Sequence, residues 1–397
     1  MQLSELLDRV SEPQTILMAK LSRELKARGI NLVDLSLGEP DFQTPQHIKE
    51  AAKRALDEGY TRYPPVAGFP ELRQAISVKL KRDNNLEYAP EQTIVSTGAK
   101  QALANAILCL LNEGDEAIIP TPYWVTYSAL VSLAKGKCVF IPCGIEENFK
   151  LSPEKLKAAI TSKTRLFIFS SPCNPTGAVY SKEELEALKD VFVQYPDIMI
   201  ISDEIYEYIN YKGKHESIAQ FPEIKDRVAL VNGFSKGFAM TGWRLGYMAA
   251  GTELVKAYDK LQSQFTSGAN SIAQRAGITA LLDDLTPTRE MTMAFEERKE
   301  YFIKALSEIP GLKINEPDGA FYAFPDISSF FGSSFGTTKI NNADDMAMYL
   351  LHTAHVTGVS GSAFGDENCI RFSFAASLEA LREGVERIKN ALGNLKI

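Results

Sequence analysis

The sequence predicts an α/β fold, in which a large domain with a mainly parallel sheet flanked by helices is joined to a smaller α+β domain. The 397 residues are enough for one large core and a second, smaller one. From Thr93 onward, short apolar runs alternate with helical segments, which is typical of a parallel sheet covered on both faces. Near the C-terminus, "DGAFYAFPDI" and "CIRFSFAAS" have the pattern of strands with alternating faces. We expect residues 46–299 to form the large domain, and residues 1–45 with 300–397 the small one.

The N-terminal part is predicted to be mostly helical. Residues 1–29 have the pattern of an amphipathic helix that is interrupted at Pro13 and ends at Gly29. A short strand in "INLVDLSLGEPDF" then runs into a turn around Gly38, and a helix follows over residues 46–59. The next stretch, "YTRYPPVAGFPELRQAI", is a stiff aromatic loop that leads into a helix and suits contacts with a partner.

The large sheet is predicted from seven apolar runs. The first lies in "TIVSTGAKQALANAILCLL", which has the pattern of a strand, a tight turn and a helix. Six further strands follow, at "EAIIP", "CVFIP", "RLFIFS", "DIMIIS", "VALVNG" and "LGYMAA". A long helical stretch from about Ile272 to Leu306 is expected to connect the large domain to the small one.

Composition excludes several classes of partner. The formal charge of −7 and the absence of lysine or arginine runs give no basic field for nucleic acid or for an anionic membrane. No run approaches the roughly 20 apolar residues of a membrane span. The N-terminus carries charges throughout, so we expect no signal peptide and a cytoplasmic location. The remaining partners are small molecules or a second copy of the chain.

The cysteines and histidines predict neither disulfides nor a metal. The cysteines are odd in number, scattered and without CxxC spacing, which disfavours a disulfide framework and a zinc site. His352 and His355 are three apart, but no carboxylate motif accompanies them. We therefore expect no bound metal.

The stretch "VALVNGFSKGFAMTGWRLGY" contains the most informative side chain, Lys236. The apolar run that begins at Val228 predicts a buried strand that ends at the turn Asn232–Gly233, so Lys236 lies at the mouth of a strand. A lysine there is either a solvated surface charge or is held for chemistry. Arg244 follows eight residues later, and a lysine and an arginine aimed into one pocket indicate an anionic carbonyl ligand. Pyridoxal phosphate is the common cofactor of this kind.

Polar and aromatic side chains follow the carboxyl ends of the other predicted strands, where open parallel sheets bind ligands. Trp124 could stack on a flat ring, and Asn174 offers an amide. Asp203 and Tyr206 follow the strand "DIMIIS". Arg371 interrupts an apolar strand, which is costly unless an anion meets it, either a ligand or the partner of a structural ion pair.

The turn Ser96–Ala99 lies at a helix N-terminus, where free amides and the helix dipole favour a phosphate. This signal is weak alone, because many strand-to-helix turns contain glycine. Neither GxxxxGK[ST] nor GxGxxG is present, which disfavours a nucleotide loop and an NAD-dependent oxidoreductase.

Several motifs together resemble those of class I pyridoxal-phosphate-dependent aminotransferases. They are "LSLGEPDF", "YPPVAGFPELR", "TPYWVTY", "SPCNPTGAVY", "SDEIYEY", "SKGFAMTGWRLGY" and "IRFSFA", in the same order and at comparable spacing. The resemblance covers most of the chain and is strongest to the bacterial branch of the aspartate aminotransferases. It implies fold type I of the pyridoxal-phosphate enzymes and a homodimer with shared active sites.

The resemblance also implies roles for individual residues. Lys236 would carry the cofactor covalently and move a proton between the substrate Cα and the cofactor C4′. Asp203 would pair with the pyridine nitrogen, and Asn174 and Tyr206 would bind the phenolic oxygen. Trp124 would stack on the ring and border the substrate. The phosphate would be held by Gly98, Ala99, Lys100, Ser235 and Arg244, with Tyr63 contributed by the neighbouring subunit.

For the substrate, the resemblance implies that Arg371 binds the α-carboxylate bidentately, assisted by the backbone of Gly38 and by Asn174. The arginine that meets the distal carboxylate in animal-type aspartate aminotransferases has no equivalent here that the sequence identifies. The bacterial branch is thought to use a threonine and a lysine, which align with Thr15 and Lys100. Lys100 could equally be a solvated lysine at the start of a helix.

These implications predict an aminotransferase that moves the amino group of aspartate to 2-oxoglutarate in a ping-pong cycle. Alternatives on the same fold are transaminases for aromatic amino acids, alanine, kynurenine or prephenate. A lyase or ring-forming synthase would keep the same cofactor residues and release ammonia or a thiol. A non-enzymatic regulator would need an added DNA-binding region, for which the first predicted strand leaves no room.

Overall fold

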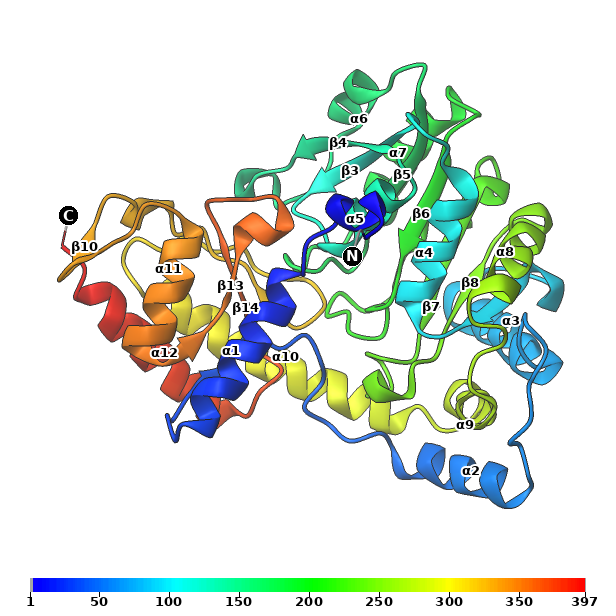
Figure 1. The fold of residues 1–397 in the computed structure, drawn as a ribbon, viewed down its shortest axis with the longest axis horizontal. Helices are drawn as coiled ribbons and strands as arrows, with labels where there is room; N and C mark the ends of the chain where they lie inside the picture. Colours follow the sequence, from blue (N-terminus) through cyan, green and yellow to red (C-terminus); the bar gives the residue numbers. More distant parts are fainter. Residues whose placement is uncertain (1–2, 397) are drawn as a thin grey trace.

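The computed structural model describes residues 3–396, which form two domains side by side (Figure 1). The large domain surrounds a seven-stranded sheet in the order β2-β8-β7-β6-β5-β3-β4. Only β8 runs antiparallel to its neighbours, so the predicted mainly parallel sheet is confirmed. Its strands are β2 (Thr93–Ser96), β3 (Glu116–Thr121), β4 (Lys137–Pro142), β5 (Thr164–Ser170), β6 (Met199–Asp203), β7 (Val228–Gly233) and β8 (Gly246–Ala249).

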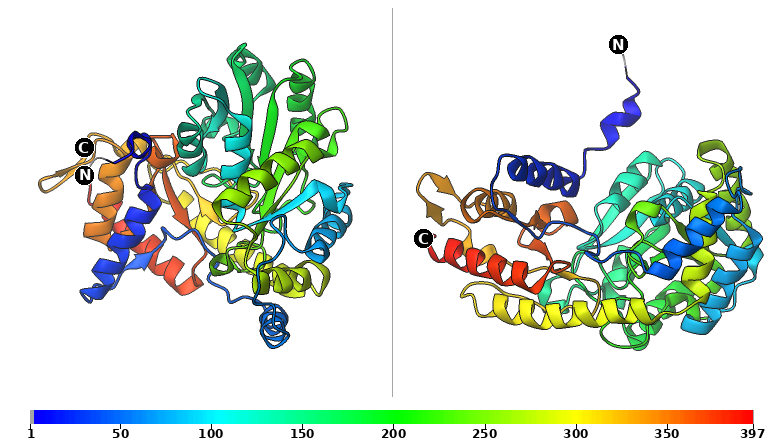
Figure 2. Two further views of the ribbon diagram at one scale, coloured as in Figure 1. Left: turned by 45° about the vertical axis from the view of Figure 1, so that its right-hand side comes forward. Right: turned by 90° about the horizontal axis from the view of Figure 1, so that it is seen from below.

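Helices cover both faces of this sheet, as the second view in Figure 2 also shows. Successive residues of β5 point to opposite faces, so that Leu166 joins one core and Phe167 the other. Because both faces are buried, the strands are continuous apolar runs. One face carries α2 (Gln46–Asp57), α3 (Pro70–Asn84), α6 (Pro153–Ala159), α7 (Lys182–Val193) and α9 (Ser271–Leu282), and the other carries α4 (Ala99–Leu110), α5 (Thr126–Leu133) and α8 (Thr252–Phe265).

The small domain has its own core and joins the two ends of the chain. A three-stranded antiparallel sheet has the order β13-β14-β9, and β1 pairs in parallel with β12. This agrees with a large domain plus a smaller α+β one, while the boundaries at residues 45/46 and 299/300 stay a prediction. The elements are α1 (Gln14–Ala27), β1 (Val33–Asp34), α10 (Thr286–Ser307), β9 (Tyr322–Ala323), β10 (Ser334–Phe335), β11 (Thr338–Lys339), α11 (Ala343–Tyr349), β12 (Val356–Thr357), β13 (Val359–Ser360), β14 (Ile370–Ser373) and α12 (Leu378–Gly393).

One predicted element is wrong. The expected helix from Ile272 to Leu306 is two helices, α9 and α10, separated at residues 283–285. Asp283 is extended and ends α9, and Pro287 lies in the first turn of α10. A proline fits there because its nitrogen needs no intrahelical acceptor, whereas in a continuous helix it would remove a hydrogen bond. At the N-terminus, Pro13 separates the 3₁₀ turn Glu5–Arg9 from α1, as predicted.

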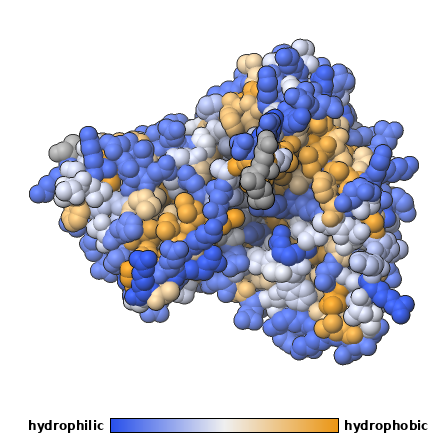
Figure 3. Space-filling view, viewed as in Figure 1, coloured by the Kyte–Doolittle hydropathy of each residue, from blue (hydrophilic) through white to orange (hydrophobic). Residues whose placement is uncertain are grey.

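On the face shown in Figure 3, apolar side chains gather next to a recess between the two domains. Among the helices of residues 3–396, none combines the length and apolar character that a membrane crossing requires.

A cluster of buried charged side chains lies next to the carboxyl end of β6. Lys79 on α3 forms an ion pair with Glu207 and donates to Asn84 Oδ1 over 2.8 Å. Glu204 accepts from His215 Nε2 over 2.9 Å. The potential ligand atoms of Glu204, Glu207 and His215 lie within 4.8 Å of one another, but an internal partner already serves each carboxylate. That no metal binds stays a prediction.

Replacing Glu207 with alanine is expected to destabilise the protein by about 3–5 kcal/mol, because the Lys79 charge would be left buried without its partner. Lys79 is fully buried and cannot reach water without local unfolding. Urea denaturation followed by circular dichroism measures the change. The matched control is Glu50→Ala, which breaks the exposed ion pair with Lys53 and should leave the midpoint unchanged. Equal midpoints for the two variants would show that Lys79 finds another partner.

Candidate active site

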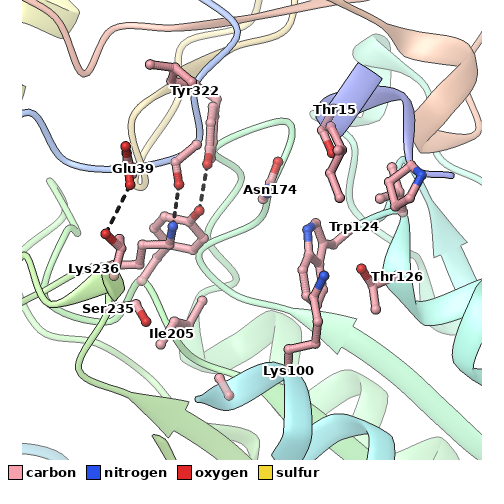
Figure 4. A pocket seen from close by; sticks show the side chains of 18 of the residues that line it. Thr15, Glu39, Lys100, Trp124, Thr126, Asn174, Ile205, Ser235, Lys236 and Tyr322 are labelled. Atoms are coloured by element: carbon pink, nitrogen blue, oxygen red, sulfur yellow. Dashed lines mark hydrogen bonds between the residues drawn. The ribbon is translucent and has the colours of Figure 1, made fainter. Parts of the chain in front are cut away.

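A cavity of about 530 Å³ lies between the two domains, at the carboxyl ends of β5, β6 and β7. Side chains from both domains line it, as Figure 4 shows for those around Lys236 and Trp124. It brings together most of the residues that the sequence singled out: Thr15, Gly38, Ala99, Lys100, Trp124, Asn174, Asp203, Tyr206, Ser235, Lys236, Arg244 and Arg371. Gly98 lies directly behind the cavity wall, and Tyr63, which is 96% exposed, lies on the outer surface.

Lys236 follows β7 and points into the cavity, where its amine donates to the carbonyl oxygen of Gly38 (Figure 4). The amine lies 5.7 Å from the ring centroid of Tyr206 and 5.8 Å from that of Phe321. Burial lowers the pKa of Lys236 to about 8; among the nearby charges Glu39 opposes this fall, whereas the positive charge of Arg371 adds to it. Far more of these amines are therefore neutral near neutral pH than for an ordinary lysine, and a nucleophile or base needs the neutral form.

Asp203 is the last residue of β6 and is 4% exposed. Its Oδ2 accepts from the hydroxyl of Tyr127 over 2.7 Å, and its Oδ1 accepts from the amide of Ile205 over 3.3 Å. Burial raises its pKa to about 6, although both hydrogen bonds favour the charged form. A buried carboxylate of this kind is stabilised by a cationic or N–H partner from the cavity.

Arg371 extends from β14 and is 2% exposed. Its guanidinium lies between two aromatic rings, with centroids 4.5 Å away for Tyr322 and 4.8 Å away for Phe364. It donates to Asn174 Oδ1 over 2.9 Å and to the Ser36 carbonyl over 2.8 Å, while its Nε has no protein acceptor. Within residues 3–396 no carboxylate forms an ion pair with it. The described residues therefore hold no structural ion pair for Arg371, and its buried charge is left without an anionic partner from the chain.

The N-terminus of α4 and Arg244 form an anion cradle. Gly98 precedes the helix with a φ of 81°, and the amides of Ala99 and Lys100 at the start of α4 have no intrahelical acceptors. A Cβ at Gly98 would lie 2.5 Å from Nη2 of Arg244, so only glycine lets the guanidinium lie there. Ser235 and Arg244 line the same cavity. Amides, a hydroxyl and a guanidinium together suit a phosphate.

Trp124 and Lys100 form the wall opposite Lys236 (Figure 4). The Lys100 amine lies 5.0 Å from the ring centroid of Trp124. Burial, and next the charge of Arg244, lower the pKa of Lys100. Thr15 projects from α1 toward the same wall. An anionic group that enters between Thr15 and Lys100 would therefore meet a hydroxyl and a partly desolvated amine.

Sequence reasoning missed four residues of the cavity. Tyr127 binds Asp203, and the hydroxyl of Tyr322 lies 2.7 Å from that of Tyr206. Ser36 receives Arg371 through its carbonyl, and Glu39 lies beside Lys236. The sequence signal for Tyr127 was its place three residues after Trp124. At that spacing it lies one helical turn further on in the segment that follows β3. The other three residues carry no local signal that separates them from turn and strand residues.

The chain matches the family model for aminotransferase class I and II over residues 30–388. It is 47% identical to the bifunctional aspartate aminotransferase and glutamate/aspartate-prephenate aminotransferase of Petunia hybrida, over 99% of this chain and 83% of that protein. It is 46% identical to the aspartate aminotransferase of Bacillus subtilis, over 98% of each chain. The crystal structure of the aspartate aminotransferase from Rhizobium meliloti superposes with a TM-score of 0.96 at 40% identity, over the whole of both chains. These likenesses extend over both domains and include the motifs around the cavity, so the chain is a member of the class I and II aminotransferase family.

Proposed function

We propose that this aminotransferase moves the amino group of aspartate to a 2-oxo acid with pyridoxal phosphate bound in the cavity. One observation carries the proposal: a buried amine with a pKa of about 8, on Lys236, shares a cavity with the buried carboxylate of Asp203 and the unpaired guanidinium of Arg371. When bound, pyridoxal phosphate supplies an electron sink for the α-carbon of an amino acid.

The residues present fit this cofactor. The cavity volume lies within the range of about 300–1,000 Å³ that is typical of ligand sites. Asp203 offers a negative charge to a protonated ring nitrogen at the bottom of the cavity, and the cradle of Gly98 and Arg244 offers a phosphate site at its side. The unpartnered Nε of Arg371 is left for a carboxylate. Each charged part of the cofactor and substrate therefore meets a complementary group.

In this proposal, Lys236 both tethers the cofactor and moves the proton at the substrate Cα. Its lowered pKa provides the neutral amine that each task needs. Asp203 would keep a proton on the ring nitrogen of a bound cofactor. Tyr206 and Asn174 would donate to its phenolic oxygen, and Trp124 would stack on its ring. The phosphate would be held by the amides of Ala99 and Lys100 and by Ser235 and Arg244, together with Tyr63 of the partner in a homodimer. The amide of Gly98, which was expected to join them, donates to the Ser96 carbonyl over 2.9 Å, so Gly98 contributes the space for Arg244 instead.

For the substrate, Arg371 binds the α-carboxylate, with the backbone of Gly38 and the amide of Asn174 beside it. Thr15 and Lys100 receive the distal carboxylate of aspartate. The support for this assignment is that both side chains line the cavity on the side opposite Lys236, where the Lys100 amine lies over the ring of Trp124. The homodimer is supported by Tyr63, whose ring is 96% exposed and so is open to contact with a second copy of the chain. A cytoplasmic location stays a prediction.

The proposal predicts that the purified protein is yellow with pyridoxal phosphate, that aspartate alone converts its absorbance to that of the pyridoxamine form, and that 2-oxoglutarate restores it. Alanine, glutamate and phenylalanine are the parallel samples. A protein that takes up no cofactor would refute the whole proposal. A yellow protein that responds only to another amino acid would refute the assignment to aspartate, and release of ammonia would indicate a lyase.

The control for the distal carboxylate is the variant Lys100→Met, which keeps the length of the side chain and removes its charge. Loss of one partly desolvated ion pair should raise the aspartate concentration needed for half-saturation about tenfold. Conversion by phenylalanine should not change, because it has no distal carboxylate. Equal effects on both substrates would mean that Lys100 serves only the phosphate.

Prephenate is a second candidate for the amino-group acceptor. The observation that favours it is the name of the Petunia hybrida relative, which is a glutamate/aspartate-prephenate aminotransferase. The pyridoxamine form, mixed with limiting prephenate or 2-oxoglutarate in separate stopped-flow runs, decides between them. The acceptor with the higher second-order rate constant is the preferred one.

A further inference from the structure

Hydrogen bonds join two segments that are far apart in the sequence, one of which carries Lys236. We name residues 38–44 the strap and residues 234–244 the lysine loop. Besides the bond from the Lys236 amine to the Gly38 carbonyl, Thr241 Oγ1 donates to Glu39 Oε2 over 3.0 Å. The other two hydrogen bonds share one atom, the hydroxyl oxygen of Thr44. The strap thus supplies both the acceptor for the lysine and the anchor for its loop.

The Thr44 hydroxyl is the junction between the two segments. It donates to the carbonyl of Ala239 over 2.7 Å and accepts from Trp243 Nε1 over 3.0 Å. The hydroxyl therefore acts both as a donor and as an acceptor. A side chain that can only donate or only accept could not replace it. Serine is the conservative alternative, because it keeps the hydroxyl at the same carbon.

Ala239 shows why the lysine loop needs this anchor. Its φ is 49°, a left-handed conformation that is unfavourable for a residue with a Cβ. In this conformation its amide donates to the Lys236 carbonyl over 3.3 Å and closes the turn that carries the lysine. A strained turn persists only where its surroundings hold it, and the bond from Thr44 to the Ala239 carbonyl is such a restraint.

We propose that Thr44 is a positioning residue for Lys236, acting through Ala239 and Trp243 to keep the lysine amine inside the cavity. Thr44 is not among the residues that line the cavity, so it touches neither the cofactor nor the substrate site. That this positioning serves catalysis rests on the proposed function. That Thr44 positions the lysine amine does not depend on that function.

Loss of the hydroxyl has a measurable consequence at Lys236. Without it, the Ala239 carbonyl and the Trp243 N–H lose their partner, the turn relaxes, and the amine moves toward water. An amine that regains hydration has a pKa closer to its ordinary value, so the pKa of Lys236 should rise. The charged and titratable groups that face the amine are Glu39 on the strap, Arg244 at the end of the lysine loop, Asp203 at the end of β6, Tyr206 after it, and Arg371 on β14.

The test measures the titration of Lys236 in the cofactor-free protein. Limiting acetic anhydride is applied between pH 6.5 and 10.5, and acetylation of Lys236 is quantified by peptide mass spectrometry against exposed Lys137 as internal reference. In Thr44→Val, which keeps the shape of the side chain, the midpoint should rise by about one pH unit. Trp243→Phe removes the hydrogen bond from the Trp243 N–H to the Thr44 hydroxyl, and it should also raise the midpoint.

Two controls make the result specific. Thr44→Ser restores the hydroxyl and should keep the wild-type midpoint. Thr93→Val removes a threonine hydroxyl that donates to the Pro90 carbonyl over 2.8 Å at the far end of the sheet, and it should also keep that midpoint. A wild-type midpoint in folded Thr44→Val and Trp243→Phe would overturn the inference. If the wild-type protein transaminates no amino acid while these shifts are observed, the proposed function fails and the positioning role stands.

Discussion

Replacing Lys236 with alanine is expected to abolish amino-group transfer while the protein stays folded. The variant loses the lysine whose amine lies against Gly38 inside the cavity, and with it the covalent tether and the base for the Cα proton that we propose. General acid–base catalysis alone contributes about 10²–10⁴-fold, and loss of the covalent step adds to this. We therefore expect kcat to fall by at least about 10⁴-fold.

The phosphate and ring contacts remain in this variant, so weak cofactor binding should persist and is measurable by dialysis with absorbance detection. Circular dichroism and thermal unfolding check the fold. Lys137→Ala on the edge strand β4 is the matched control and should turn over normally, since Lys137 is exposed and lies outside the cavity. Near-normal turnover by the Lys236 variant would overturn the assignment of the whole site.

Replacing Arg371 with lysine should reduce kcat/KM for aspartate about 10³-fold, which corresponds to about 4 kcal/mol of lost binding to a buried charge. A lysine keeps the charge but cannot present two parallel N–H groups to a carboxylate, nor stack between the rings of Tyr322 and Phe364. The loss should occur with every amino acid, because all of them share the α-carboxylate.

A substrate analogue separates recognition from general damage. The compound 3-aminopropanoate keeps the amino group and distal carboxylate of aspartate but lacks the α-carboxylate. Its slow reaction should be the same in the wild type and in Arg371→Lys. The variant Arg382→Lys, which changes an arginine stacked on Tyr301 outside the cavity, should behave as the wild type. Equal losses for aspartate and its analogue would assign Arg371 a structural role instead.

Much of the site could be predicted because its residues follow the ends of parallel strands. Asn174, Asp203 and Lys236 lie far apart in sequence, but the carboxyl ends of β5, β6 and β7 meet at one edge of the sheet. Arg371 was identifiable for a different reason, since a charge inside an apolar strand is costly without an anion. The polar residues at the strand ends and the charge within an apolar strand were each a local sequence pattern that favours one structural arrangement.

The parts that were missed depend on contacts with no local pattern. The Trp243 side chain reaches Thr44 across 199 residues, and Tyr206 meets Tyr322 across 116. Hydrogen bonds of this kind are set by the packing of one domain on the other, which periodicity does not report. The break between α9 and α10 was missed because Pro287 is compatible with a kinked helix as well as with a new one, and only packing decides between them.

The pairing of β1 with β12 ties a segment that is made first to one that is made almost last. During synthesis on the ribosome, β1 has to wait without a partner strand, whereas the large sheet is complete once β8 has emerged. Tyr322 and Arg371, which also line the cavity, appear later still. The cavity therefore takes its full shape only when the chain is nearly finished.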